Sequence, residues 1–296
     1  MSHQKMVSCS CIHAFAFVAT LAAGLTFGGP VHATPVTSGL VGWFDAQDID
    51  GDGLTNDNPA DAAHVPTWID KSSAGNDLTS TSGSQPLYKV GTLNGKNIID
   101  FIGGAQFLSA SSSTLNMTSA TIFAVRDAPF STALVSIAPG STIDNEFLIY
   151  TKTIYHHSSF NNSESLGHDA VPSGFFVQAA VFGTTPTDLQ NFIDGVASTQ
   201  SSVTTNSPTN YTEQDRRISI GGRNDGNTLF PGDIAEVLIY NRKLSAGELN
   251  QVGYYLADKY GIETTYTANV PEPSALWLLA VGAVASVGFL RRKGTR

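Results

Sequence analysis

The chain has almost no cysteine: only Cys9 and Cys11 occur among 296 residues, and both lie near the N-terminus. Residues 1–33 combine a basic start, an apolar stretch over residues 12–29 and the small-x-small triplet Val31-His32-Ala33. This is the pattern of a secretory signal peptide, which we expect to be cleaved. The exported chain would then have no thiol, which excludes disulfides and cysteine-based metal sites from its fold.

Positive charge is also scarce in the rest of the chain. All 25 acidic residues fall between Thr34 and Pro273, but only eleven of the 16 Lys and Arg residues do, so this segment has a net charge of −14. Nucleic-acid binding depends on clustered cations that neutralise phosphates, and this composition therefore excludes nucleic acid as a partner. It is compatible with divalent cations and with uncharged polymers.

Local motifs of two large hydrolase classes are missing as well. The sequence contains no Gly-x-Ser-x-Gly and no His-Glu-x-x-His, so serine-hydrolase and zinc-protease chemistry have no motif to rest on. His156, His157 and His168 could hold a transition metal, but their spacing does not align three ligands, and we expect loop histidines facing solvent.

The C-terminal segment, residues 267–296, has three parts in a fixed order. Pro271-Glu272-Pro273 leads into an uncharged apolar run over residues 275–290, and the basic end, residues 291–296, begins with Arg291, Arg292 and Lys293. Sixteen residues give roughly 24 Å of helix, a little less than a hydrocarbon core of ~30 Å. This order resembles the PEP-CTERM sorting signal, which exosortase systems recognise and process at the bacterial surface.

The resemblance implies a route for the whole protein. The basic end would stay on the cytoplasmic side of a transmembrane helix, leaving everything before Pro271 outside. The partners it implies are the secretion machinery, an exosortase and, before processing, the membrane. We therefore expect an exported protein of the cell envelope or extracellular matrix.

The segment between the two signals, residues 34–266, is expected to be all-β. Short β-forming runs such as 40–44, 121–125 and 234–240 alternate with clusters of Gly, Ser, Asn, Asp and Pro. Asp194-Gly195 after one such run is typical of a hairpin turn, because both residue types tolerate positive φ. The pattern predicts a two-sheet sandwich. Serine-rich stretches such as 109–114 are expected to be surface loops.

One short helix is predicted after the last strand. Ser245 and Glu248 form a capping-box pair, and Leu249, Val252 and Leu256 then follow at helical spacing. Gly261 stands where a left-handed C-terminal cap would end the helix. We expect this helix to be appended to the sandwich.

Two longer segments carry a family resemblance. Residues 68–78, followed by Leu93-Asn94-Gly95-Lys96, and residues 218–245 resemble motifs of LamG-like domains, which belong to the concanavalin A-like lectin/glucanase superfamily. The resemblance covers about residues 39–262 and implies a jelly-roll sandwich. Ser73 replaces a glycine that many relatives have, which could shift that loop without changing the fold.

The same resemblance bears on catalysis. Enzymes of this superfamily that cleave β-glucans carry Glu-x-Asp-x-x-Glu, which places nucleophile and acid on one face of a strand. The nearest match, residues 213–218, ends in Ile218, so the acid pair is broken. We therefore expect a protein that is not an enzyme.

An acidic loop is the best candidate for a binding site. Asp48, Asp50 and Asp52 occupy the first, third and fifth positions of a stretch with Gly at the sixth, as in the opening of an EF-hand loop. The twelfth position holds proline instead of the closing Glu, and Asp57 or Asp61 could close the coordination sphere instead. We expect structural Ca²⁺ here, with a merely solvated acidic loop as the alternative.

Aromatic residues suggest a second candidate site. Tyr155, in a polar stretch beside His156, is predicted to be a surface aromatic that contacts glycan, whereas Trp43 and Trp68 are predicted to belong to the core. Together these features predict an exported, non-catalytic binding or structural module, Ca²⁺-stabilised and binding carbohydrate, in the cell envelope or an exopolysaccharide matrix. The alternatives are a glycan hydrolase or lyase on the same sandwich and a surface adhesin that binds another protein.

Overall fold

The computed structural model describes residues 34–102, 104–127, 132–139, 146–159, 162–183, 188–201, 203–204 and 216–268. The predicted signal peptide and the sorting segment from residue 269 onward lie outside these ranges. Within them, no helix has the length and apolar character needed to cross a membrane.

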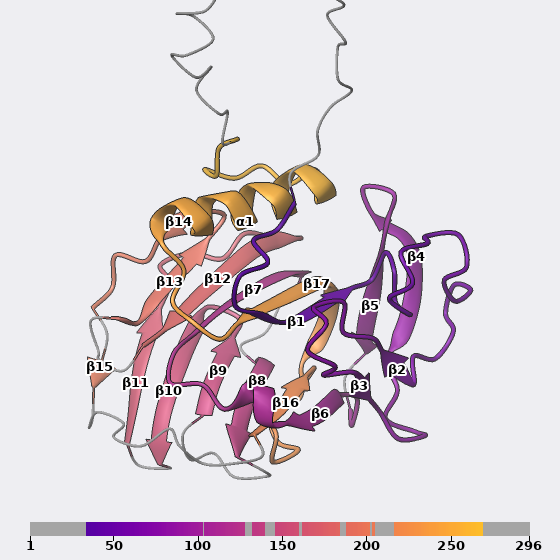
Figure 1. The fold of residues 1–296 in the computed structure, drawn as a ribbon, viewed down its shortest axis with the longest axis horizontal. Helices are drawn as coiled ribbons and strands as arrows, with labels where there is room; N and C mark the ends of the chain where they lie inside the picture. The colour runs from indigo at the N-terminus through magenta and orange to yellow at the C-terminus, as the bar shows by residue number, and fades with distance from the viewer. Residues whose placement is uncertain are drawn as a thin grey trace, which may run out of the picture. The chain divides into compact units, whose positions relative to one another are not determined.

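The described residues form two antiparallel sheets and one α-helix (Figure 1). The first sheet, called sheet A, runs in the order β14-β13-β12-β7-β17-β5-β4, with β1 also paired to β17. Its strands are β1 (Leu40–Asp45), β4 (Leu87–Leu93), β5 (Lys96–Ile102), β7 (Ala120–Asp127), β12 (Phe176–Phe182), β13 (Gln190–Ile193), β14 (Val196–Ala197) and β17 (Pro231–Tyr240).

The second sheet, called sheet B, runs in the order β15-β11-β10-β9-β8-β16-β6-β3-β2. Its strands are β2 (Thr67–Trp68), β3 (Leu78–Thr79), β6 (Leu108–Ser112), β8 (Ala133–Pro139), β9 (Glu146–Tyr150), β10 (Thr153–Ser159), β11 (Asn162–Gly167), β15 (Val203–Thr204) and β16 (Arg216–Ile220). A 3₁₀ turn, η1 (Ser113–Leu115), follows β6. The two-sheet sandwich and the single helix confirm the predicted fold class.

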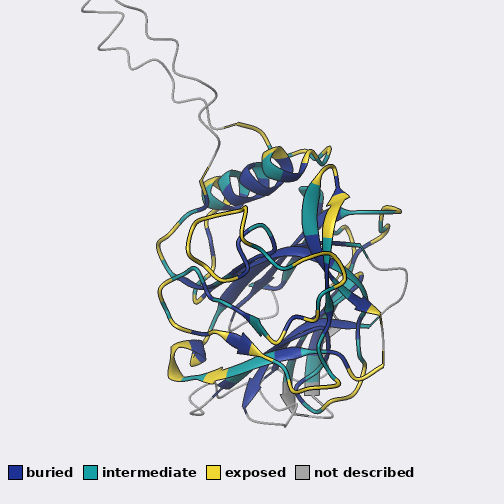
Figure 2. Cartoon of the chain, turned by 90° about the vertical axis from the view of Figure 1, so that its right-hand side faces the viewer, coloured by how far each residue is buried: buried dark blue, intermediate teal, exposed yellow. Residues whose placement is uncertain are grey.

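The middle of sheet A is apolar on both faces because each face is covered there. On β7, Ile122 and Ala124 pack into the core between the sheets, whereas Phe123 and Val125 pack beneath the helix. The successive side chains of a strand point to opposite faces, so a run without polar interruption marks a strand buried on both sides. Figure 2 shows both sheets largely buried, with exposed residues mostly on the loops.

The helix α1 (Ala246–Tyr260) forms a third layer over sheet A. The Ser245 side chain accepts from the amide of Glu248, the Glu248 carboxylate accepts from the amide of Ser245, and Gly261 closes the helix at φ 63°. The predicted capping box and glycine cap are therefore confirmed. Leu249, Val252 and Leu256 are buried against sheet A, as their spacing predicted.

The chain on both sides of the described domain lies along α1. The Thr34 carbonyl accepts from Nε2 of Gln251 at 3.3 Å, and the Thr267 carbonyl accepts from Nδ2 of Asn250 at 2.8 Å. Tyr266 packs over Gly253 so closely that a Cβ atom there would lie 2.5 Å from its ring. Both ends of the described domain therefore emerge beside the helix.

The local turn and loop predictions had different outcomes. Asp194 and Gly195 have φ values of 50° and 80° and join β13 to β14, as the hairpin signal predicted. The loop predicted over residues 109–114 is wrong, because residues 109–112 belong to β6 and pair with β16. Serine residues can form a strand at this position because the backbone groups of β6 are hydrogen-bonded to those of β16.

Candidate functional site

An aromatic row lies on the face of sheet B that points away from sheet A. The rings of Tyr150 and Tyr155 meet edge to face, with centroids 5.2 Å apart. The imidazole of His157 stacks on Tyr155 with centroids 5.5 Å apart and only 6° between the ring planes. Tyr150 and Tyr155 are both half-buried, so parts of their rings remain accessible.

A buried ion pair lies beside this row. Oε2 of Glu146 is 2.8 Å from a guanidinium nitrogen of Arg223, and Oε1 accepts from the hydroxyl of Ser136 at 2.5 Å. Burial raises the pKa of Glu146, and the hydrogen bond and charge of Arg223 oppose that rise. His157 Nε2 lies 4.0 Å from the same carboxylate. Because Glu146 is fully buried and the Arg223 side chain is 14% exposed, the pair fixes the Arg223 guanidinium as a donor next to the aromatic rings.

The imidazole of His157 is uncharged at neutral pH. Burial, followed by the nearby positive charge of Arg223, lowers the pKa of His157 to about 4. A neutral ring stacks on Tyr155 as an aromatic surface and does not add a positive charge to this face. The rings of Tyr155 and His157 are nearly parallel and the Tyr150 ring is turned by 77° to that of Tyr155, so the row is a mostly apolar cluster of rings with polar groups at its edge.

Strand register and one loop assemble this site. β9 and β10 pair so that Leu148 faces Tyr155 and Glu146 faces His157. The loop after β16 then folds back over the sheet, where the amide of Asn224 donates to the hydroxyl of Ser136 at 3.3 Å. This loop delivers Arg223, which lies in the family-like segment 218–245 but was not predicted as a site residue. Glu146 was missed as well, because its partner is 77 residues away.

The predicted surroundings of Tyr155 are corrected by the structure. Tyr155 and His156 lie in β10 and not in a polar loop, because β10 pairs with β9 and β11 over most of its length. Tyr155 does face outward, but His156 alternates into the core and packs on Phe147 at 4.7 Å. His168 lies elsewhere, with its ring nitrogens 2.8 and 2.9 Å from the carbonyls of Ala170 and Val196. In the described ranges the three histidines do not form a metal cluster.

The acidic loop has the convergent arrangement that its spacing predicted. One carboxylate oxygen each from Asp48, Asp50 and Asp52 lie within 4.8 Å of one another. Asp48 is buried, whereas Asp50 and Asp52 are exposed. Desolvation and the neighbouring carboxylates of Asp52 and Asp50 raise the pKa of Asp57. Asp57 thus neighbours Asp52 and Asp50 but does not belong to the group of oxygens within 4.8 Å, and Asp61 accepts from the amide of Val90.

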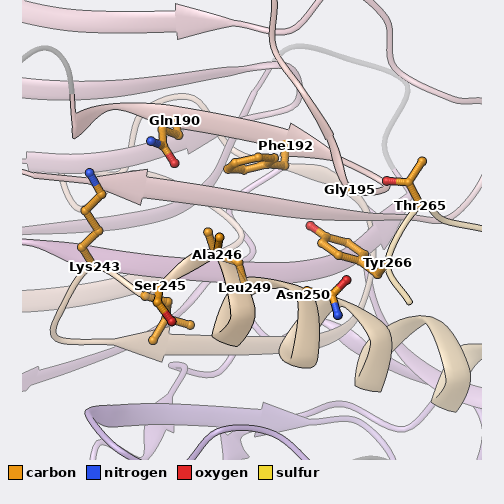
Figure 3. Close-up of a pocket in the computed structure, with 11 residues that line it drawn as sticks. Gln190, Phe192, Gly195, Lys243, Ser245, Ala246, Leu249, Asn250, Thr265 and Tyr266 are labelled. Carbon is orange, nitrogen blue, oxygen red and sulfur yellow. The ribbon is translucent and has the colours of Figure 1, made fainter. Parts of the chain in front are cut away.

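Hollows also occur elsewhere on the described surface. One, of about 570 Å³, lies over β3, β6 and β16 and contains Arg217, whose guanidinium donates to the hydroxyl of Ser109 at 2.7 Å. Another, of about 390 Å³, lies between β13 and the start of α1 (Figure 3). Phe192, Leu249 and Tyr266 line it, so it is the more apolar of the two.

Sequence comparison identifies the domain. Residues 103–250 match the Laminin_G_3 profile, described as concanavalin A-like lectin/glucanases superfamily. The chain belongs to this superfamily. The match confirms the family resemblance and includes residues 218–245, whereas residues 68–78 lie outside it, and it agrees with the observed sandwich. A search of curated protein sequences finds no match.

Residues 269–293 match the PEP-CTERM protein-sorting motif. This confirms the reading of Pro271-Glu272-Pro273, the apolar run and the basic residues Arg291, Arg292 and Lys293 as a sorting signal. The motif indicates an exported protein that has a C-terminal membrane anchor and is processed by an exosortase. These residues lie outside the part of the chain that the structure describes.

Solved structures with a similar fold are distant in sequence. A GH54 α-L-arabinofuranosidase has 16% identity and a TM-score of 0.50, covering 82% of this chain and 64% of its own. A mutant of HCR/D has 11% identity and a TM-score of 0.50, covering 75% and 52%. Trypanosoma rangeli sialidase has 14% identity and a TM-score of 0.44, covering 76% and 34%. This LamG-like chain thus spans less than two thirds of each of these proteins, and the likeness concerns the fold alone.

Proposed function

We propose that this LamG-like protein is an exported, non-catalytic module that binds polysaccharide in the cell envelope or an exopolysaccharide matrix. The observation that carries the proposal is the row Tyr150-Tyr155-His157 beside the pair Glu146-Arg223 on the outer face of sheet B. A sugar ring has apolar C–H faces and a hydroxyl rim. Half-buried aromatic rings beside a guanidinium that Glu146 holds in place can contact both parts.

The charge of the site favours a neutral or weakly charged glycan. Arg223 is paired with Glu146, and His157 is neutral, so the row has little net charge of its own. The surrounding segment is acidic, with a net charge of −14 between residues 34 and 273. Strongly acidic polymers would be repelled by that field, whereas neutral polymers would not be affected.

Glycan-array binding by the purified full chain, in detergent, tests the proposal. Tyr155→Ala removes the central ring of the row, and we expect it to weaken binding by about 10-fold or more, as for loss of a buried aromatic contact in an interface. Tyr254→Ala is the matched control, because Tyr254 is a half-buried tyrosine on α1, away from sheet B. Equal binding by parent and Tyr155→Ala variant, or no glycan bound at all, would contradict the proposal.

Catalysis is tested separately on the same face. A retaining glycosidase needs two carboxyl groups about 5 Å apart, one of which has a raised pKa. Glu146 has a raised pKa, but it is held by Arg223 and Ser136. We expect no release of reducing ends from any glycan that binds. Reducing ends that disappear in a Glu146→Gln variant would instead identify a hydrolase.

A further inference from the structure

The acidic loop carries an inference that is independent of glycan binding. Asp48 is only 2% exposed, and its Oδ1 atom has no hydrogen-bond partner among the described residues. A carboxylate oxygen buried without a partner is unfavourable, because it has lost its hydration and gained no hydrogen bond in return. Asp48 belongs to the cluster with Asp50 and Asp52, so a cation in that cluster would satisfy the oxygen.

The other oxygen of Asp48 is fully engaged. Oδ2 lies 2.7 Å from Nζ of Lys71 and accepts from the amide of Gly53 at 3.1 Å. The same ammonium lies 3.1 Å from Oδ2 of Asp45. Only Oδ1 is left to bind a ligand.

The backbone of the loop is already held in shape around the cluster. Asn58 closes its base, accepting from the amide of Ile49 at 3.1 Å and donating to the carbonyl of Gln47 at 2.7 Å. The carbonyl of Ile49 accepts from the amide of Ile69 at 2.9 Å, which ties the loop to the chain after β2. The carboxylates of Asp50 and Asp52 are therefore presented on a loop with fixed ends.

We propose that Asp48 Oδ1, Asp50, Asp52 and Asp57 bind one Ca²⁺, and that Lys71 is a positioning residue that limits the affinity of this site. Ca²⁺ binds oxygen at 2.3–2.6 Å, so two of its ligands can lie about 5 Å apart, and oxygens within 4.8 Å of one another are compatible with that geometry. Mg²⁺ requires near-ideal octahedral geometry at 2.0–2.1 Å and keeps several waters, so a loop of carboxylates favours Ca²⁺.

Lys71 acts on the site in two ways. Its ammonium holds Oδ2 of Asp48, so Asp48 can contribute only one oxygen to the ion. It also places a positive charge within a few ångströms of the bound cation, which weakens binding. Without metal, the same ammonium offsets part of the repulsion between the carboxylates. The loop therefore keeps its shape without metal, and calcium binding adds to that order.

Calorimetric titration of the full chain in detergent with CaCl₂, after chelation, is the first test. We expect one Ca²⁺ per chain, and weakening by about 100-fold or more in the double variant Asp50→Asn/Asp52→Asn, because ligand charge sets the affinity of such loops. Asp258→Asn/Glu263→Gln is the control, since it removes the same charge at exposed positions near the end of α1. No Ca²⁺-dependent heat in the parent, undiminished binding in the loop variant, or equal affinity for MgCl₂ would overturn the site.

Terbium luminescence gives a second readout that also locates the site. The Trp43 ring lies 4.8 Å from Nζ of Lys71, and the same ammonium contacts Asp48. Tb³⁺ bound in the loop should be sensitised through tryptophan, and Ca²⁺ should displace it. Sensitised emission that survives in the Asp50→Asn/Asp52→Asn variant would place the metal elsewhere and refute the site.

The role of Lys71 has its own pair of variants. Lys71→Met removes the charge and frees Asp48 Oδ2, so we expect about 10-fold tighter Ca²⁺ binding, whereas Lys71→Arg keeps the charge and should change affinity little. Melting of both variants in chelator shows whether they fold. If folded Lys71→Met binds Ca²⁺ no more tightly than the parent, the assigned role of Lys71 is wrong, even though the site itself stands.

Discussion

The indole Nε1 of Trp43 donates to Oε1 of Glu236 across 2.6 Å, although the two residues are 193 positions apart in the chain. Glu236 is fully buried, and three groups of α1 also donate to it: the hydroxyls of Tyr255 and Tyr260, at 2.8 and 2.9 Å, and the ammonium of Lys259, at 2.7 Å. One carboxylate thus joins β1, β17 and the helix.

Replacing this carboxylate should be among the most destabilising single changes in the chain. In Glu236→Ala, the ammonium of Lys259 and three N–H or O–H donors lose their shared partner in the interior. We expect a loss of about 3–5 kcal/mol in the free energy of unfolding, measured by chemical denaturation. Glu263→Ala, at an exposed position after the helix, should change it by less than about 0.5 kcal/mol. Similar effects of the two variants would show that the network does not hold the helix.

Three aspartates on neighbouring strands of sheet A predict a pH dependence. Asp233 on β17 is the register partner of Asp100 on β5 and of Asp127 on β7. Burial, followed by the negative charges of Asp100 and Asp127, raises the pKa of Asp233 to about 6. The folded state therefore holds this proton more tightly than the unfolded state does. Stability from this group is greatest below about pH 4 and is lost as pH rises through 6.

The variant Asp233→Asn should remove that pH dependence. Because the carboxyl is partly exposed, we expect a gain of only about 1 kcal/mol in unfolding free energy at pH 7.5 and little change at pH 4. Melting curves at the two pH values measure it. Asp258→Asn, on α1, is the control, and its effect on the unfolding free energy should be the same at the two pH values. A variant less stable than the parent at pH 7.5 would contradict the proton-linked account.

The contact between Gly253 and Tyr266 predicts a change in protease sensitivity. Alanine is the better helix former by about 1 kcal/mol, so Gly253→Ala should leave α1 folded while its Cβ displaces the Tyr266 ring. We expect faster chymotrypsin cleavage after Tyr266, followed by mass spectrometry. Gly247→Ala is the matched control, because no atom lies within 4 Å of a Cβ at that helix position. Equal cleavage rates would show that Tyr266 is not held by this contact.

The sorting motif can be separated from simple anchoring. Changing Pro271-Glu272-Pro273 to alanines leaves the apolar run over residues 275–290 intact, so membrane association should persist while processing is lost. In a host with the matching exosortase, we expect the parent protein to lack the residues beyond about Pro273. Mass spectrometry of the C-terminal peptide distinguishes processed from unprocessed protein. A parent chain that still ends at Arg296 would contradict processing.

How well a feature could be predicted from the sequence depends on how far apart its interacting residues lie in the chain. The capping pair Ser245 and Glu248 and the Asp194-Gly195 turn are set within a few residues, so their sequence signals were sufficient. The Asp48 cluster was also visible from spacing alone. Its partner Lys71 was not, because only the fold brings the ammonium to the loop. Glu146 and Arg223, likewise, become neighbours only through sheet pairing and a returning loop, and the sequence carries no periodicity that marks them.

The positions of the two ends of the described domain affect which face remains accessible when many copies are tethered side by side. Thr34 and Thr267 both contact α1, which covers sheet A, whereas Tyr155 lies on the outward face of sheet B, the opposite layer of the sandwich. In a copy tethered through either end, the described domain would therefore join the tether beside its helix, on the layer of the sandwich opposite the aromatic row. Many copies standing side by side would leave all their rows accessible at once. Weak individual contacts with one long polymer would then add up through avidity.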